Sequence, residues 1–495
     1  STSIAADQYL AHPVPDVIAE RRVIQIAPGF AGQRLALPEG IMPTAICWLR
    51  DKSLAFSTLK GQVYLVDDDD SEDPADPHYL FVDGLATPYG IGTNKSGRIE
   101  VLTKTALLRF SNGDYPRAEE VEYQASGWGV TNDYHDWAIG LTPGKDGERY
   151  LGLPCQQDGR KEAAAKYRGQ VLKLVPNFDK EGNQLHYTIE TVSTGHRFPL
   201  GLALNRAGDL FVTDNQGNYN PFNELNHVRP GAFFGFVNAI EKKQGTKPPP
   251  LVPPAIDIPH PWTRSVNGIC FLDTPKELLE KIPLAERADY KVFGPLEGHL
   301  VGCEYDSRQL IRMTLQRVGD TYQGAAYPLS IPPRNIEDGL LGPLVCAVSP
   351  RGELYVGNIR DSGWGAGNNV GDIVKIKIEP EKLPGGIQEV RATSEGFVID
   401  FFRPVDRAKA TNPANYALAS YRRESTSAYG GPNLDRRIEK LAAVTLSDDA
   451  RQVSLRLKEL RPGFVYEFQL QPLTRGKELF HPAEAHYTLR QIPAE

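Results

Sequence analysis

Two similar segments of the chain carry a histidine and an arginine in corresponding positions, each directly before a short apolar stretch. His135 lies in "NDYHDWAIGL" and Arg197 lies in "TGHRFPLGLAL". An imidazole can accept a proton near neutral pH, and a guanidinium can stabilise a developing oxyanion or bind a carboxylate. Together they suit the oxidation of an alcohol or a lactol. A lone histidine in a turn more often makes a structural hydrogen bond, so the chemical interpretation requires that both side chains face one opening.

Further candidate residues occupy the same kind of position, just before other apolar stretches. These candidate substrate contacts are Tyr89, Tyr134 and Asp136. If the site worked without a cofactor, as a lyase or hydrolase on sugars, Tyr89 or Tyr134 would be its acid or base.

The segment after Arg197, "TDNQGNYNPFNELN", is a polar loop with Gly217 and Pro221. Its backbone carbonyls could bind a hard cation such as Ca²⁺, although it lacks the dense carboxylates of an EF-hand. An ordinary Asn-rich turn is the alternative. The acidic run at 67–76 is expected to be a solvated loop. The glycines at 363–369 precede no Lys-Ser/Thr, which excludes a nucleotide-binding loop.

The candidate residues belong to a repeat of short strand pairs that occurs six times. The apolar positions that match between the copies are Ile46, Ile91, Ile139, Leu202, Ile269 and Ala347. Turn pairs such as Ser-Gly, Asp-Gly and Arg-Gly separate the first and second strand of a copy.

Six units of short antiparallel strands predict an all-β fold, a six-bladed β-propeller whose innermost strands line a central channel. The segment "RRVIQIAPGF" at 21–30 is expected to add a strand to the last blade and to close the ring. A pair of β-sandwiches is the alternative, but it would leave the shared pattern unexplained.

The repeat ends near residue 388, and the remaining strands alternate in another pattern, such as "QVSLRLKEL" and "FVYEFQLQPL". We expect an N-terminal extension at 1–20, the propeller at 21–388, and a smaller Ig-like or fibronectin-like β-sandwich at 389–495. The last domain is similar to the bacterial Ig-like modules appended to secreted proteins.

Composition narrows the functional classes. The net charge of −7 gives no general basic field, so nucleic acid is not an expected partner. The five cysteines contain no CxxC pair and are expected to be small buried residues, with at most one disulfide. No apolar run is long enough to span a membrane. The first residues, Ser-Thr-Ser, fit a secreted or periplasmic protein and equally a trimmed chain.

The stretch at 194–236, with its "GHR", "NELN" and "GAFFGF" motifs, resembles the central segment of the soluble PQQ-dependent glucose, sorbosone and pyranose dehydrogenases. This resemblance implies a six-bladed propeller, PQQ and calcium. His135 corresponds to the family's catalytic base, and Arg197 to its arginine. Calcium would be bound by carbonyls at Gly217 and Asn218.

The resemblance also implies which residues would hold the cofactor. Trp262 and Thr263 correspond to the segment that walls the quinone. The family binds the PQQ carboxylates with a Lys and an Arg-x-Arg pair before the last inner strand, where this chain reads "LLGPLVCAVSP". The arginines that could substitute are Arg264, Arg308 and Arg334. The asparagine that follows the family arginine is Phe198 here.

The leading hypothesis is therefore a PQQ- and calcium-dependent sugar dehydrogenase. His135 would abstract a hydroxyl proton while a hydride passes to the quinone, and a cytochrome could accept the electrons. Two alternatives remain open: the cofactor-independent lyase or hydrolase, and a propeller that only binds carbohydrate or protein.

Overall fold

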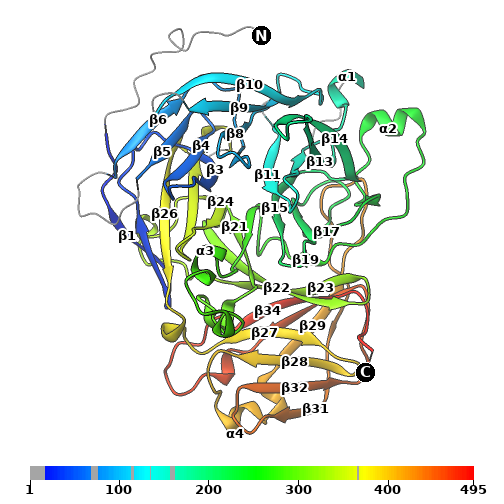
Figure 1. Cartoon of the computed structure of the whole chain (residues 1–495). Helices are drawn as coiled ribbons and strands as arrows, with labels where there is room; N and C mark the ends of the chain where they lie inside the picture. Colours follow the sequence, from blue (N-terminus) through cyan, green and yellow to red (C-terminus); the bar gives the residue numbers. More distant parts are fainter. Residues whose placement is uncertain are drawn as a thin grey trace.

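The computed structural model describes residues 17–67, 76–112, 116–133, 135–155, 162–364 and 367–494. They form an all-β protein, with a ring of six β-sheets and a smaller β-sandwich beside the ring (Figure 1). Tyr134 and most of the acidic run at 67–76 lie outside the described residues.

Blades 1 to 5 each have four antiparallel strands in sequence order from the axis outward, and blade 6 has three such strands completed by two from the N-terminal segment. Blade 1 consists of β3 (Pro43–Trp48), β4 (Leu54–Thr58), β5 (Val63–Val66) and β6 (His78–Val82). Blade 2 consists of β7 (Gly90–Thr93), β8 (Ile99–Leu102), β9 (Ala106–Asn112) and β10 (Ala118–Ser126). Blade 3 consists of β11 (Ile139–Pro143), β12 (Arg149–Leu153), β13 (Gln170–Phe178) and β14 (Gln184–Thr194), and β14 also pairs with β18 (Ala232–Phe233).

The other three blades follow the same plan. Blade 4 consists of β15 (Pro199–Leu204), β16 (Leu210–Asp214), β17 (Asn223–Val228) and β19 (Ile256–Ile258). Blade 5 consists of β20 (Val266–Phe271), β21 (Leu300–Glu304), β22 (Gln309–Val318) and β23 (Thr321–Pro328). Blade 6 consists of β24 (Pro343–Val348), β25 (Leu354–Arg360), β26 (Val370–Ile378) and the N-terminal strands β2 (Phe30–Arg34) and β1 (Arg22–Ala27).

The six innermost strands form a closed ring, in which β3, β7, β11, β15, β20 and β24 each contact the next and β24 contacts β3. All six apolar positions matched in the sequence lie in these strands. In five blades, the inner strand is followed by a turn in which the second residue of the predicted turn pair has a left-handed conformation, with φ between 72° and 90°. Four of these residues are glycines, which adopt this conformation at little cost; the fifth is Lys52.

The N-terminal segment closes the ring, as predicted, but as a hairpin rather than a single strand. β2 pairs with β26, with Phe30 opposite Ile378, and β1 pairs with β2 at the outer edge. The chain reverses at Pro28 and Gly29, and Gly29 has a φ of 87°. Closure gives blade 6 its fourth and fifth strands and covers the edge of β26.

The C-terminal part is a sandwich of two sheets. One contains β27 (Ile387–Ala392), β28 (Gly396–Phe401), β32 (Gln452–Leu457) and β31 (Leu441–Leu446), and the other contains β34 (Glu484–Leu489), β33 (Phe464–Gln469), β29 (Ala417–Arg422) and β30 (Leu434–Ile438). Their facing side chains, among them Phe397, Tyr466 and Tyr487, form one buried core. β34 also pairs with β23, so blade 5 and the second sheet are one continuous eight-stranded sheet.

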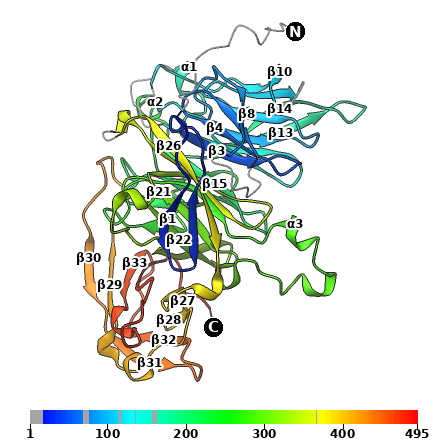
Figure 2. The same ribbon diagram turned by 90° about the vertical axis from the view of Figure 1, so that its left-hand side faces the viewer.

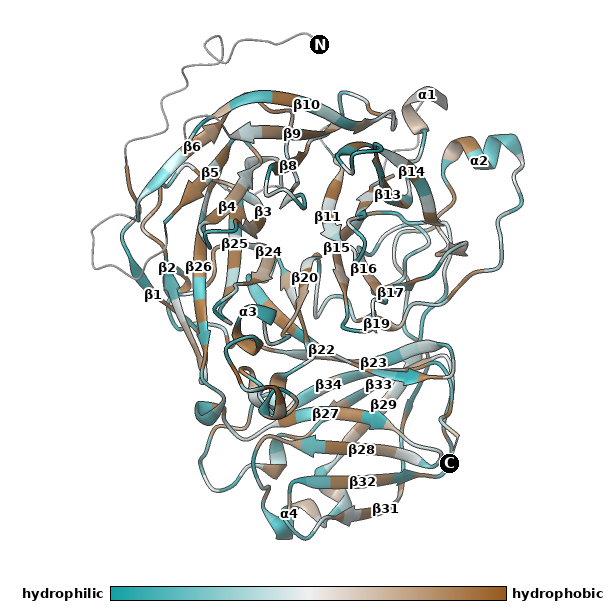
Figure 3. Ribbon diagram, in the orientation of Figure 1, coloured by the Kyte–Doolittle hydropathy of each residue, from teal (hydrophilic) through white to brown (hydrophobic). Residues whose placement is uncertain are grey.

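Helices are few and short in the described residues. They are α1 (Glu162–Ala165), α2 (Ala239–Gln244), α3 (Lys276–Leu279) and α4 (Arg407–Ala410). Single 3₁₀ turns are η2 (Leu284–Glu286), η3 (Gly294–Leu296), η4 (Ile336–Asp338), η5 (Ser362–Trp364), η6 (Pro380–Lys382), η7 (Pro413–Asn415) and η8 (Gln471–Leu473). Helix α2 buries no residue and is mostly hydrophilic, while the strands of the blades alternate in hydropathy (Figure 3). No described helix is long and apolar enough to cross a membrane.

Strand direction decides which loops share each end of the channel. All six inner strands run in the same direction along the channel. The connections that lead into these strands therefore lie at one end of the channel, and the turns between the second and third strand of each blade lie at that same end. We call this end the mouth. Helix α1 and the connection between β29 and β30 lie on the mouth side, and α3 lies on the opposite side (Figure 2).

Candidate functional site

His135 lies in the connection that enters β11 and is held by two neighbours. Its backbone N–H donates to Oδ1 of Asp133 at 2.7 Å, and the same oxygen lies 3.6 Å from Nδ1 of the imidazole. Trp364, from blade 6, donates its indole N–H to Nε2 at 3.3 Å. This arrangement assigns the ring proton to Nδ1, beside the carboxylate, and the lone pair to Nε2.

Two opposing effects set the pKa of His135. Burial is the larger and lowers the pKa below its ordinary value, because desolvation disfavours the imidazolium. The carboxylates of Asp133 and Asp361 raise the pKa, and the charge of Arg197 lowers it. Since the net shift is downward, His135 is neutral at pH 7, the protonation state that a general base needs.

Arg197 lies in the connection that enters β15 and is 7% exposed. Asp214, the last residue of β16, fixes this connection by accepting the backbone N–H groups of Arg197 at 2.9 Å and of Phe198 at 2.6 Å. The guanidinium donates from Nη1 to the carbonyl of Gln216 at 3.1 Å, whereas its buried Nε has no partner. A methyl group at Gly217 would lie 2.0 Å from that Nε, so a glycine leaves room for the guanidinium.

The structure brings His135 and Arg197 close together at the mouth. The His135 ring packs against the Phe198 ring at 5.9 Å between centroids, and Phe198 is the residue after Arg197. The positive charge of Arg197 is close enough to lower the pKa of His135. A neutral imidazole and a cation therefore lie close together at the mouth, where they could accept a proton and stabilise a negatively charged oxygen.

Aromatic rings pack together beside His135. Trp137 is fully buried and contacts four other rings, Tyr89 at 4.9 Å, His135 at 5.4 Å, Trp364 at 5.7 Å and Phe198 at 5.8 Å between centroids. Tyr305 packs against Trp364 at 4.7 Å. The Tyr, Trp and Phe rings, with aliphatic side chains of other inner strands, form one cluster at the mouth end of the channel. Most of these rings are buried, and Trp364 is the one that is partly exposed and can meet a ligand.

The three predicted substrate contacts differ in position. Tyr89 is 4% exposed, its hydroxyl has no partner, and burial raises its pKa well above the ordinary value. Because its pKa is raised, Tyr89 keeps its proton at neutral pH, so it has no phenolate with which to act as a base. Asp136 is also buried and accepts the backbone N–H and the hydroxyl of Thr131, which makes it an anchor of the loop around His135. Tyr134 lies outside the described residues.

The predicted cofactor contacts are not brought together. The Trp262 indole donates to Glu484 of the sandwich at 2.7 Å, and the buried Thr263 hydroxyl donates to the carbonyl of Pro259. Arg264 and Arg334 are exposed.

Arg308 is placed differently, because it lies in a mouth turn beside Arg360 at the end of β25. Burial and the charge of Arg360 lower the pKa of Arg308. The Arg360 guanidinium lies 5.3 Å from the centre of the Tyr305 ring. Two neighbouring cations of this kind suit an anionic group.

The predicted metal ligands, Gly217 and Asn218, are engaged by the C-terminal part of the chain. The carbonyl of Gly217 accepts the N–H of Gly430 at 3.1 Å, and the Asn218 side-chain amide donates to the carbonyl of Ser427 at 2.8 Å. Among the described residues, no group of three His, Cys, Asp or Glu side chains is arranged to hold a metal ion. All five cysteines are free thiols, so the structure contains no disulfide.

Four residues of the site were missed in the sequence. Asp133 precedes His135 by two positions, and this spacing could have identified it. Trp364 and Arg360 come from blade 6, and Tyr429 comes from the sandwich, with its ring centre 5.4 Å from the Arg197 guanidinium. No local pattern signals these three, because only the closed ring and the docked sandwich bring them to the mouth.

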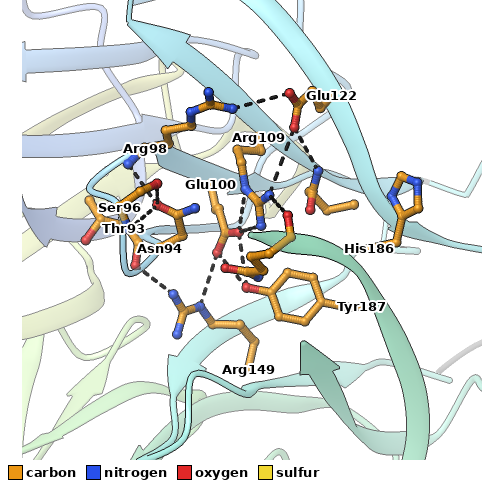
Figure 4. Close-up of polar contacts among 12 residues, drawn as sticks. Thr93, Asn94, Ser96, Arg98, Glu100, Arg109, Glu122, Arg149, His186 and Tyr187 are labelled. Carbon is orange, nitrogen blue, oxygen red and sulfur yellow. Dashed lines mark hydrogen bonds and ion pairs between the residues drawn. The ribbon is translucent and has the colours of Figure 1, made fainter. Parts of the chain in front are cut away.

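A second polar cluster lies between blades 2 and 3. The buried Glu100 accepts hydrogen bonds from Arg109 at 2.8 and 3.1 Å, from Arg149 at 3.3 Å and from the Tyr187 hydroxyl at 3.1 Å (Figure 4). Arg149 also donates to the carbonyl of Thr93 at 2.6 Å, next to the turn at the end of the channel opposite the mouth. Since each member has its partner within the protein, we interpret the cluster as a joint between blades.

Comparisons with known proteins agree with this fold. A family profile described as a domain of unknown function (DUF7133) matches residues 48–247. No curated protein matches the chain. Among solved structures, the holo form of the pyranose dehydrogenase PQQ domain from Coprinopsis cinerea has a TM-score of 0.51 at 13% identity, over 72% of this chain and 98% of the other. The chain shares the fold of that sugar dehydrogenase.

Two further structures of the same kind are similar at lower scores. The PQQ-bound form of the aldose sugar dehydrogenase from Streptomyces coelicolor has a TM-score of 0.48 at 16% identity, over 74% of this chain and 99% of the other. The apo form of the soluble aldose sugar dehydrogenase from Escherichia coli has a TM-score of 0.45 at 15% identity, over 72% and 99%.

Proposed function

We propose that the protein is a sugar oxidoreductase of the PQQ-dependent type, with its active site at the mouth of the propeller. The observation that carries the proposal is the position of His135. Its Nε2 accepts the indole N–H of Trp364, its Nδ1 lies beside Asp133, and the charge of Arg197 is close enough to lower its pKa. The propeller fold, shared with sugar dehydrogenases, agrees with the proposal.

The chain's own residues can perform the acid–base part of this reaction. A sugar hydroxyl that displaces the Trp364 indole would give its proton to Nε2 of His135. The imidazolium that forms is stabilised by the carboxylate of Asp133, and the guanidinium of Arg197 stabilises negative charge on a neighbouring oxygen. The partly exposed ring of Trp364 suits the apolar face of a pyranose.

The cations of the mouth fit a tricarboxylate such as PQQ. The guanidinium of Arg197 and the adjacent guanidiniums of Arg308 and Arg360 would hold its anionic groups. When bound, PQQ supplies an acceptor for the two electrons and the hydrogen that leave the sugar carbon as a hydride. Calcium at Gly217 and Asn218 does not fit, because the C-terminal part of the chain covers both residues and hydrogen-bonds to them, and no step is assigned to it.

The test uses the purified full chain, PQQ and an artificial dye as electron acceptor. We expect dye reduction with one or more aldoses, and a fall in kcat of about 10²–10⁴-fold in His135→Gln, because a general base contributes a factor of that size. The melting temperature should change little, since the imidazole is partly exposed.

His186→Gln is the matched control, because His186 is an exposed residue of the outer strand β14. If the wild-type chain neither changes the absorbance of PQQ nor reduces the dye with any aldose, the proposed function is wrong. If His135→Gln retains full activity, the assignment of the base is wrong.

A further inference from the structure

The loop at 216–221, in which the family resemblance implies calcium, is covered by a segment of the sandwich. Residues 423–430, which we call the clasp, belong to the connection between β29 and β30. In Figure 2 this connection extends from the sandwich along the mouth side of the propeller. Asn218 and Tyr429 pair as an isolated antiparallel bridge, so the clasp adds backbone pairing to the loop.

The clasp supplies hydrogen-bond donors to the carbonyls of this loop. The N–H of Gly430 donates to the carbonyl of Gly217 at 3.1 Å, and the hydroxyl of Ser425 donates to the carbonyl of Tyr219 at 2.7 Å. In return, the N–H of Tyr219 donates to the carbonyl of Thr426 at 2.7 Å.

Arg423 places a permanent positive charge on the same loop. Its Nη1 donates to the carbonyl of Pro221 at 3.0 Å and its Nη2 donates to the carbonyl of His260 at 2.7 Å. His260 lies in the connection that enters β20, so one guanidinium ties together two loops of the mouth. Two contacts fix the position of the Arg423 guanidinium. The side-chain oxygen of Asn433 accepts a hydrogen bond from its Nε at 2.8 Å, and the centre of the Phe222 ring lies 4.8 Å away.

These contacts use the acceptors that a cation would need. Ca²⁺ takes six to eight oxygen ligands. In this loop the carbonyls of Gly217, Tyr219, Asn220 and Pro221 each accept a hydrogen bond from within the protein. The N–H groups of Gly430 and Gly217 are buried, and an ion that displaced them from these carbonyls would leave them unpaired, which is costly.

We propose that the clasp replaces calcium as the organiser of the loop at 216–221. The sandwich then completes the mouth: it fixes the backbone around Gly217, against which Arg197 packs, and lays Tyr429 over the guanidinium of Arg197. Arg423 provides the positive charge that an ion would otherwise bring to the carbonyls. This inference concerns the architecture of the loop and holds whether or not the chain oxidises sugars.

The experiment measures hydrogen–deuterium exchange of the amides at 216–221 in the full chain, once with 1 mM Ca²⁺ and once with EDTA. This Ca²⁺ concentration is on the order of the weakest dissociation constants of extracellular calcium-binding modules. We expect wild-type exchange at this loop to be the same in both conditions. In the double variant Arg423→Ala, Ser425→Ala, which lacks three donors to the propeller, we expect exchange there to be at least about tenfold faster, equivalent to about 1.4 kcal/mol.

Arg456→Ala is the matched control, because Arg456 is an exposed residue of β32 in the same domain. Exchange in the strands of blades 1 and 2 reports whether the variants remain folded. The proposal is overturned if Ca²⁺ slows exchange of the wild-type loop tenfold or more, and this arm needs no variant to fold. It is equally overturned if the folded double variant exchanges at the wild-type rate.

Discussion

At the scale of single residues, the mouth holds an imidazole between two partners that act on it in opposite directions. Asp133 favours the imidazolium, and its carboxylate raises the pKa of His135. The indole N–H of Trp364 can donate to Nε2 only while that nitrogen is unprotonated, so it favours the neutral ring. A substrate hydroxyl must take the place of this indole at Nε2, which makes Trp364 a positioning residue for the base.

The first prediction concerns the pH dependence of the site. In Trp364→Phe the neutral imidazole loses its donor, so we expect the pKa of His135 to rise and the acidic limb of kcat/KM to move to higher pH. Asp133→Asn should move the limb to lower pH, because the neighbouring negative charge is lost. The pH profile of dye reduction measures both shifts, and an NMR titration of the His135 ring measures them without turnover.

Trp48→Phe is the control for the loss of an indole, since Trp48 lies at the far end of β3 and packs against Tyr355. A limb that stays in place in Trp364→Phe, or moves to lower pH, would show that the indole does not act on the base.

At the scale of elements, the sequence predicted the parts of the fold that repeat. Each inner strand carries its own apolar position and its own turn, so Ile91 or Leu202 could be placed from a few neighbouring residues. The hairpin at the N-terminus was predicted only in part. The Pro28–Gly29 reversal was present in the sequence as a turn signal, but whether β1 or β2 pairs with β26 depends on a strand about 350 residues away.

The second prediction tests whether this hairpin contributes to the core of blade 6. Ile26 is 2% exposed and packs in the same cluster as Val374 and Ile376 of β26, whereas Val23, on the same strand, is 74% exposed. We expect Ile26→Ala to lower the free energy of unfolding by about 2–5 kcal/mol, through lost burial and a cavity. Val23→Ala should change it by less than about 0.5 kcal/mol.

Denaturant unfolding of the full chain, followed by tryptophan fluorescence, measures both changes. Equal and small effects of the two substitutions would mean that the hairpin is peripheral to the stability of the ring.

At the scale of the whole molecule, the sandwich is part of the propeller's own sheet. The sequence predicted a second domain near residue 389 but not its attachment, because the pairing of Gly324 with Thr488 joins strands that are far apart in the chain and share no local signal. Arg312 of β22 strengthens this junction. Its buried guanidinium donates to the carbonyls of Ile387 and Gln388 and lies 4.2 Å from the centre of the Tyr327 ring.

The same junction contains a histidine that cannot readily take a proton. Nδ1 of the buried His299 accepts a hydrogen bond from Nη1 of Arg312 at 2.9 Å. Burial, followed by the charge of Arg312, lowers the pKa of His299 well below its ordinary value of 6.5. Burial also lowers the pKa of five other histidines, His135, His227, His260, His481 and His486.

The last prediction follows from these shifts. In the unfolded chain each histidine takes a proton as the pH falls through about 6.5, while in the folded protein these groups stay neutral to lower pH. Below this pH the unfolded state therefore binds more protons than the folded state. The contribution of each such group to stability is complete above this pH and is lost as the pH falls below it, by up to about 1.4 kcal/mol per pH unit. Buried carboxylates whose pKa is raised, among them Asp372 to about 6, act in the opposite direction, so the test compares variants. As the pH falls from about 7 to 5, we expect the wild type to lose more melting temperature, or gain less, than His299→Gln, whose side-chain oxygen can accept from Arg312 without titrating. The exposed His186→Gln serves as control and should follow the wild-type curve. A His299→Gln variant with the wild-type slope would contradict the assignment of His299 as a neutral buried acceptor at the junction.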